Sequence, residues 1–130
     1  MNVLIIEPTE HTPGVDFNPA TGKLMLSGRS LPENAIEFYD PVFEWLENYL
    51  EMPPQRTELH VDLDYLNSIS QKMVVEILKN TRKVLEKGKT MSVKWYYEEE
   101  DEKMMEEGKA IASEFEIPID LITKPAAGGA

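Results

Sequence analysis

The sequence predicts a single α/β domain in which a mixed β-sheet is covered by helices. Stretches with strand-like alternation and stretches with helical spacing follow one another along the chain, which is typical of such a sheet. Strands precede the first helix, and 130 residues suit one domain with its own core. We assign residues 1–123 to this domain and residues 124–130, which are rich in Ala and Gly, to a loose tail.

The N-terminal part of the chain predicts a hairpin-like pair of strands. The first is a short apolar run at residues 3–7, which a proline closes. The second covers residues 23–28 and follows a turn sequence at residues 18–22. We expect Asp16 and Phe17 to belong to an intervening strand.

The middle of the chain predicts a helix, a strand and a second helix. Apolar residues at helical spacing predict a helix over residues 34–49, interrupted or kinked near Pro41. Residues 57–63 alternate between polar and apolar with period two, which predicts the clearest strand of the chain. Helical spacing returns over residues 68–87, and Gly88 supplies a C-terminal stop.

The last third predicts a strand, a helix and a final strand. Residues 90–97 alternate again and indicate a strand. The acidic run at residues 98–102 then lies at the positive N-terminal end of a helix, whose inner face is expected within residues 104–115. A last short strand is expected over residues 117–122.

Charge and composition argue against several classes of function. The net charge of −11 counts against a nucleic-acid partner, because phosphate backbones attract clustered Lys and Arg. The chain has no cysteine and therefore no disulfide or thiolate metal site. The first residues do not match a secretion signal, and no apolar run is long enough for a membrane span, so we expect a cytoplasmic protein without membrane insertion.

The sequence gives no signal for a metal or a cofactor. The two histidines, His11 and His60, are far apart in sequence and lack a ligand pattern. The acidic run at residues 98–102 lacks the spaced ligands and the glycine of a calcium loop. Glycine-rich nucleotide motifs and the Gly-x-Ser-x-Gly elbow are also missing from the sequence.

The candidate functional site is the corner at Asn67 and Ser68, where the strand over residues 57–63 passes into the next helix. A small hydroxyl at a helix start lies among unpaired backbone N–H groups, where a phosphate changes charge, hydrogen bonding and shape together. Ser68 with Gln71 also matches a capping box, in which the serine bonds to a first-turn amide. The two interpretations are compatible, and Ser70 is the second choice as a phosphate acceptor.

Four segments carry a resemblance to a known family. They are residues 28–35 (Gly-Arg-Ser-Leu-Pro-Glu-Asn-Ala), residues 38–42 (Phe-Tyr-Asp-Pro-Val) with Trp45, residues 65–72 (Tyr-Leu-Asn-Ser-Ile-Ser-Gln-Lys), and residues 93–97 (Val-Lys-Trp-Tyr-Tyr) followed by Asp101. Together they resemble the SiaC family of bacterial regulatory phosphoproteins, a group of small STAS-like domains linked to biofilm control.

The resemblance implies a STAS-like fold and a partner-switching function without catalysis. A dedicated Ser/Thr kinase would phosphorylate Ser68, and a PP2C-type phosphatase would remove the phosphate. The unphosphorylated form would bind a GGDEF diguanylate cyclase and promote its activity, and so tune the synthesis of cyclic di-GMP. We expect the partner interface at Asn67, Ser68, Ile69 and Lys72.

Three other functions fit parts of the sequence. An anti-sigma-factor antagonist would share the phosphoserine switch but act on a different client. A small carboxylate-dependent enzyme would need convergent polar groups with perturbed pKa values in a pocket, whereas a switch would need a shallow surface around Ser68. An oligomerisation module would need an apolar patch unrelated to Ser68.

Overall fold

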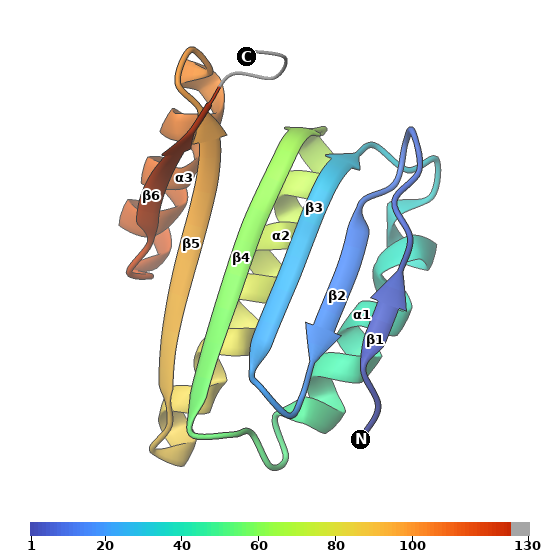
Figure 1. The fold of residues 1–130 in the computed structure, drawn as a ribbon, viewed down its shortest axis with the longest axis vertical. Coiled ribbons are helices and arrows are strands. Elements are labelled where there is room, and N and C mark those ends of the chain that lie inside the picture. The colour runs from blue at the N-terminus through green and yellow to red at the C-terminus, as the bar shows by residue number, and fades with distance from the viewer. Residues whose placement is uncertain (126–130) are drawn as a thin grey trace.

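Within residues 1–125, which the computed structural model describes, six strands form one mixed sheet whose spatial order follows the chain order (Figure 1). The first three strands pair antiparallel, and the third to the sixth pair parallel. The strands are β1 (Leu4–Ile6), β2 (Gly14–Asn18), β3 (Lys23–Ser30), β4 (Arg56–Leu66), β5 (Thr90–Glu98) and β6 (Asp120–Lys124).

The helices cover one face of this sheet and lie behind it in Figure 1. They are α1 (Ala35–Tyr49), α2 (Ser68–Thr81) with its 3₁₀ continuation η1 (Arg82–Lys87), and α3 (Glu102–Phe115). Each of α1, α2 and α3 connects two neighbouring parallel strands. Because such crossovers are almost always right-handed, strands that pair in chain order place all their helices on the same side.

The hydrophobic core lies between the sheet and the helices. Along β4, alternate side chains from Thr57 to Leu63 are buried beneath the helices, as the period-two pattern predicts. The largest fully buried side chains come from every layer of this packing, and include Phe17, Tyr39, Leu46, Tyr49, Leu59, Leu63, Ile77, Leu78 and Trp95. No helix among the described residues is long and apolar enough to cross a membrane.

The fold class, a single α/β domain with a mixed sheet covered by helices, is confirmed, but several element boundaries differ. The strand expected around Asp16 and Phe17 is confirmed as β2, which pairs with both of its neighbours. The helix expected over residues 34–49 runs without interruption through Pro41. The helix expected over residues 68–87 ends at Thr81, where the chain tightens into η1 before the left-handed Gly88.

The C-terminal boundary also differs from the expected one. We expected the loose tail to begin at residue 124, but Lys124 is the last residue of β6. Its ammonium group binds the carboxylates of Asp62 and Asp64 on β4, which ties the end of β6 to the open face of the sheet. The rest of the expected tail, from residue 126 on, lies outside the described residues.

Gly108 allows α3 to approach the sheet closely, and we predict that Gly108→Ala destabilises the fold. A Cβ at this position would lie 2.8 Å from Cδ1 of Trp95 and 2.8 Å from Cδ2 of Leu121. Trp95 is fixed because its indole N–H donates to the Met104 carbonyl at 3.0 Å. Gly→Ala stabilises an ordinary helix interior, but overpacking here should lower the free energy of unfolding by about 1–3 kcal/mol.

Urea denaturation of the unmodified chain and of Gly108→Ala measures this difference in the free energy of unfolding. Ser113→Ala, at an exposed position of the same helix, serves as the control and should change the unfolding free energy by less than about 0.5 kcal/mol. A Gly108→Ala protein as stable as the unmodified chain would show that α3 is not held against Trp95 as closely as described.

Candidate functional site

The corner between β4 and α2 lies at the edge of the sheet where the parallel strands end. β4 ends at Leu66, Asn67 forms the corner, and Ser68 is the first residue of α2. The backbone N–H of Asn67 donates to the carbonyl of Ser30 at the end of β3, 3.1 Å away. Carboxyl ends of parallel strands and the loops that follow them commonly carry functional residues, so the corner has a suitable position.

Asn67, and not Ser68, is the N-cap of α2. Its backbone is extended, and its side-chain oxygen accepts a hydrogen bond from the N–H of Ser70 at 2.9 Å. The capping box predicted for Ser68 and Gln71 is therefore wrong. The physical reason is that Ser68 already has a helical backbone, whereas the cap position requires the non-helical conformation that Asn67 adopts.

Ser68 is consequently an exposed hydroxyl that the fold does not use. It makes no hydrogen bond through its side chain to any residue of the described part of the chain. It lies in the first turn of α2, where backbone N–H groups are unpaired and the helix dipole is positive. This environment favours an anion and leaves the hydroxyl open to another protein.

Ser70 has the opposite environment, because its side chain is fully buried. Its hydroxyl accepts a hydrogen bond from Ser30 Oγ at 2.8 Å, and Ser30 Oγ lies 2.6 Å from the Tyr39 hydroxyl. Ser30 has a single proton, so Tyr39 must donate to Ser30, which donates to Ser70. This chain of hydroxyls joins β3, α1 and α2 beneath the corner, and a kinase could reach Ser70 only after local opening.

Two large side chains close to Ser68 in sequence are partly exposed. Tyr65 is 43% exposed and Ile69 is 42% exposed. The guanidinium carbon of Arg29 lies 5.8 Å from the centre of the Tyr65 ring, in a cation–π contact. Ile69 belongs to the interface predicted from the sequence, whereas Tyr65 and Arg29 are there only part of the segments that resemble the family. The pairing of β3 and β4 shifts by one residue at this point, so that Asp64 has no paired residue on β3. This bulge is not visible in the sequence pattern.

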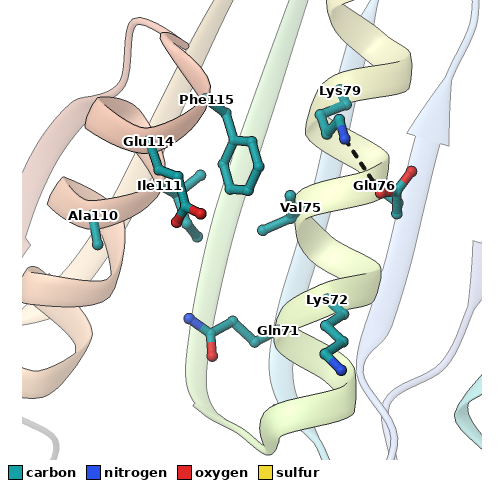
Figure 2. Close-up of a pocket in the computed structure, with 9 residues that line it drawn as sticks. All are labelled: Gln71, Lys72, Val75, Glu76, Lys79, Ala110, Ile111, Glu114 and Phe115. Atoms are coloured by element: carbon teal, nitrogen blue, oxygen red, sulfur yellow. Dashed lines mark ion pairs between the residues drawn. The ribbon is translucent and has the colours of Figure 1, made fainter.

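A groove lies between α2 and α3, and it begins one turn after Ser68. We call it the α2/α3 groove; it has a volume of about 330 Å³. Figure 2 shows its apolar side chains pointing toward one another from the two helices, with charged side chains around them. It is lined by Gln71, Lys72, Val75, Glu76, Lys79, Ala110, Ile111, Glu114 and Phe115. Lys72 belongs to the interface predicted from the sequence, but the groove itself was not predicted.

A second, smaller cavity bears on the hypothesis of a carboxylate-dependent enzyme. Asp64, Asp101 and Glu107 line it, and burial raises the pKa of the Glu107 carboxyl, an effect that nearby Lys103 opposes. The cavity has a volume of only about 100 Å³. Small-molecule sites usually measure about 300–1,000 Å³, so the cavity is too small for most substrates.

His60 has structural partners. Its Nδ1 lies 2.8 Å from the Tyr96 hydroxyl, and its Nε2 lies 2.7 Å from a carboxylate oxygen of Glu58. His11 is exposed in the loop between β1 and β2. Among residues 1–125, no group of three or more His, Asp or Glu side chains is placed to hold a metal ion.

Comparisons with known proteins agree on one family. The family model described as "SiaC family regulatory phosphoprotein" matches residues 6–124. A protein of Pseudomonas aeruginosa strain UCBPP-PA14 is 30% identical over 121 residues, which are 93% of this chain and 96% of that protein.

Solved structures of SiaC have the same fold. A chain in the crystal structure of the diguanylate cyclase SiaD with its activator SiaC, from Pseudomonas aeruginosa, is 28% identical with a TM-score of 0.85. That match covers 93% of this chain and 99% of the other. A further structure of SiaC from Pseudomonas aeruginosa is 27% identical with a TM-score of 0.84, and covers 95% of this chain and 100% of the other.

We predict that Asn67→Ala destabilises the protein and that Ser68→Ala does not. Removing the Asn67 side chain leaves the N–H of Ser70 without its acceptor, which should cost about 1 kcal/mol. The Ser68 side chain has no comparable bond, so its removal should change the unfolding free energy by less than about 0.5 kcal/mol. Chemical denaturation of both variants measures the contrast, and the reverse order would restore Ser68 as the cap.

We also predict that Tyr39 makes the protein less stable in alkali. Burial raises the pKa of Tyr39, and the hydrogen bonds of Ser30 and Ser70 only partly oppose this. A pKa raised by folding gives stability that is present below the unfolded value of about 10 and is lost as the pH rises through the folded value. Unfolding free energies measured between pH 8 and pH 11 should fall less steeply for Tyr39→Phe than for the control Tyr65→Phe; equal slopes would contradict the prediction.

Proposed function

The chain belongs to the SiaC family of regulatory phosphoproteins, and on this basis we propose that it is a non-enzymatic partner switch controlled at Ser68. A Ser/Thr kinase phosphorylates Ser68, and a PP2C-type phosphatase removes the phosphate. The unphosphorylated form binds and activates a GGDEF diguanylate cyclase in the cytoplasm, and so raises cyclic di-GMP synthesis that controls biofilm formation. The observation that carries this proposal is the exposed hydroxyl of Ser68 at the start of α2, which has no role in capping the helix.

The different roles of three neighbouring residues support Ser68 as the phosphate acceptor. Asn67 caps the helix, Ser70 joins the buried hydroxyl chain, and Ser68 alone of the three leaves its side chain exposed. A kinase can therefore reach Ser68 without disturbing the fold. The positive end of the helix dipole also favours the phosphate once it is attached, so the modified protein should remain folded.

The surface around Ser68 explains how a phosphate would prevent binding. The exposed side chains of Tyr65 and Ile69, near Ser68 in sequence, offer apolar area that a partner buries on docking. A phosphate adds about −1.5 to −2 charges, which must be desolvated in such an interface. Every ~1.4 kcal/mol changes affinity tenfold, so a few kcal/mol suffice to release a partner.

The cyclase as partner is supported by the similarity to SiaC. In Pseudomonas aeruginosa, SiaC is the activator of the diguanylate cyclase SiaD and is found in complex with it. This chain covers almost the whole of that SiaC chain. We propose that the interface includes Asn67, Ser68, Ile69 and Lys72. We add Tyr65 because its side chain is exposed.

Phosphopeptide mass spectrometry of the tagged chain from its native host, combined with cyclase capture, tests the proposal. Phosphate should map to Ser68, and Ser68→Ala should capture a GGDEF cyclase and raise its cyclic di-GMP output in a purified assay. Ser68→Asp should weaken binding at least about tenfold, because the carboxylate brings charge into the interface. Ser113→Asp places the same charge at another exposed helical serine and should bind as the unmodified chain does.

Three outcomes would count against the proposal. If Ser68 is unmodified under all conditions and its variants bind alike, Ser68 is not the switch. If an anti-sigma factor is captured in place of a cyclase, the switch would serve a different client. If Ser68 phosphorylation strengthens cyclase binding, the direction of signalling is reversed.

A further inference from the structure

We propose that the basic surface of η1 binds the outer side of α1 in a second copy of this chain, so that opposite charges hold a two-fold dimer. We call it the η1 basic surface; it comprises Lys83, Leu85, Lys87 and the adjoining Lys89. Such a dimer forms without a cyclase and without a phosphate at Ser68, so it goes beyond the proposed function.

Cations are concentrated at this end of the domain, although the chain as a whole is acidic. Five of the 13 Lys and Arg residues fall within residues 79–89, whereas the net charge of the chain is −11. Two of the five, Lys79 and Arg82, are engaged with other groups of the fold. Within residues 1–125, no ion pair involves the remaining three, which are Lys83, Lys87 and Lys89.

Leu85 gives the η1 basic surface an apolar contact. It is 49% exposed and lines a hollow of about 410 Å³ together with Lys83 and Glu86. Lys83 and Lys87 are four positions apart in a 3₁₀ helix, so they lie about 8 Å apart along its axis. A partner would therefore meet an exposed apolar side chain with cations around it, as in many protein interfaces.

The outer side of α1 carries the complementary charges. Exposed carboxylates recur every three or four residues at Glu37, Asp40, Glu44 and Glu47, and α1 contains no Lys, Arg or His. This acidic stripe runs about 15 Å along the helix. Like charges at such a spacing repel one another, so a cationic partner would relieve the repulsion. Ile36, which is 65% exposed, precedes Asp40 by one turn and offers apolar area beside the stripe.

A second copy of the chain fits the η1 basic surface better than a membrane or a nucleic acid. Those are extended arrays of phosphates, which would also face the many acids outside so small a basic surface. The α1 stripe instead presents carboxylates over a span that matches the lysines, with Ile36 available to Leu85. At physiological salt, charges more than about 8 Å apart are largely screened, so these local contacts outweigh the repulsion between two acidic chains.

The arrangement of the helices suits a two-fold contact. α1 and α2 are neighbours on one face of the sheet, and η1 continues α2 (Figure 1). Both surfaces therefore belong to the same layer of helices. In a two-fold dimer, each copy gives its η1 basic surface to the α1 of the other, so both contacts form at once.

Sedimentation velocity of the purified, unphosphorylated chain over a range of concentrations tests the dimer. The chain should show a monomer–dimer equilibrium at about 0.15 M NaCl. Its dissociation constant should rise at least about tenfold at about 1 M NaCl, where the Debye length falls to about 3 Å. A monomer at every concentration would overturn the proposal, and so would a dimer that salt does not weaken.

Reversal of the charges tests which surfaces meet. Lys83→Glu with Lys87→Glu places acids on both surfaces, and Glu44→Lys with Glu47→Lys places cations on both, so each double variant should be monomeric alone. An equal mixture of the two should form dimers again, because each contact then joins opposite charges. A mixture that remains monomeric would overturn the pairing, since a surface for an unrelated partner predicts no such rescue.

Matched controls change the net charge by the same amounts elsewhere. Lys103→Glu with Lys109→Glu, and Glu106→Lys with Glu114→Lys, alter exposed positions of α3. Each pair should leave the dissociation constant within about twofold of the unmodified chain, because these positions lie outside the contact. Thermal melts of all variants confirm that the comparison is between folded proteins.

The apolar part of the contact is tested separately. Leu85→Ser should weaken the dimer about three- to tenfold, because less apolar area is then buried between the copies. Ile5→Ser, on the edge strand β1, removes a side chain that is 61% exposed and should have no such effect. A dimer that Ile5→Ser dissociates and Leu85→Ser does not would place the contact at the sheet edge and overturn the proposal.

Single cysteines can locate the contact directly, because the chain has no cysteine of its own. In the two-fold dimer, η1 of one copy meets α1 of the other. Lys87→Cys protein mixed with Glu47→Cys protein should therefore crosslink through a short bismaleimide more than either protein crosslinks to itself. A preference for like-with-like crosslinks would overturn the pairing. None of these measurements involves a cyclase or a phosphate, so their failure would leave the switch at Ser68 standing.

Discussion

Parallel pairing of β3, β4, β5 and β6 in chain order is the constraint on which the rest of the structure depends. It places every crossover helix on one face of the sheet, so the core forms on that face and the other remains open to solvent. It also brings the carboxyl ends of the strands to one edge, where Ser30 and Asn67 come into contact. The corner that carries Ser68 is therefore a direct product of the topology.

The sequence predicts the kinds of elements well, because each is encoded by a local pattern. Alternation over residues 57–63 and helical spacing over residues 68–87 are signals of burial on one face, and the structure buries those faces. The boundaries are set by contacts that no local pattern contains. β4 continues to Leu66 because β3 pairs with it beyond a bulge, and β6 includes Lys124, which binds carboxylates on β4.

For the candidate site, the sequence predicts the position of the corner but not which of its residues caps the helix. The change from strand to helix marks the corner at Asn67 and Ser68, but two adjacent residues that can both cap a helix are not distinguished by residue type. Backbone conformation decides between them, and the bond from Asn67 to Ser30 on β3 helps to set it. The α2/α3 groove was not predictable, since it depends on how closely α3 approaches Trp95 at Gly108 and hence on the packing of separate elements.

The residues that fix the corner are different from Ser68, the proposed switch residue. The Asn67 cap and the buried hydroxyls of Ser30, Tyr39 and Ser70 hold the start of α2 whether or not Ser68 carries a phosphate. A phosphate at the first position of a helix is itself favoured by the dipole, so modification does not oppose the fold. The proposed switch would therefore change the charge of a surface and leave its shape intact. The free energy of the modification would then be expressed in binding rather than in rearrangement of the domain, so that signalling would need no second conformation of the domain.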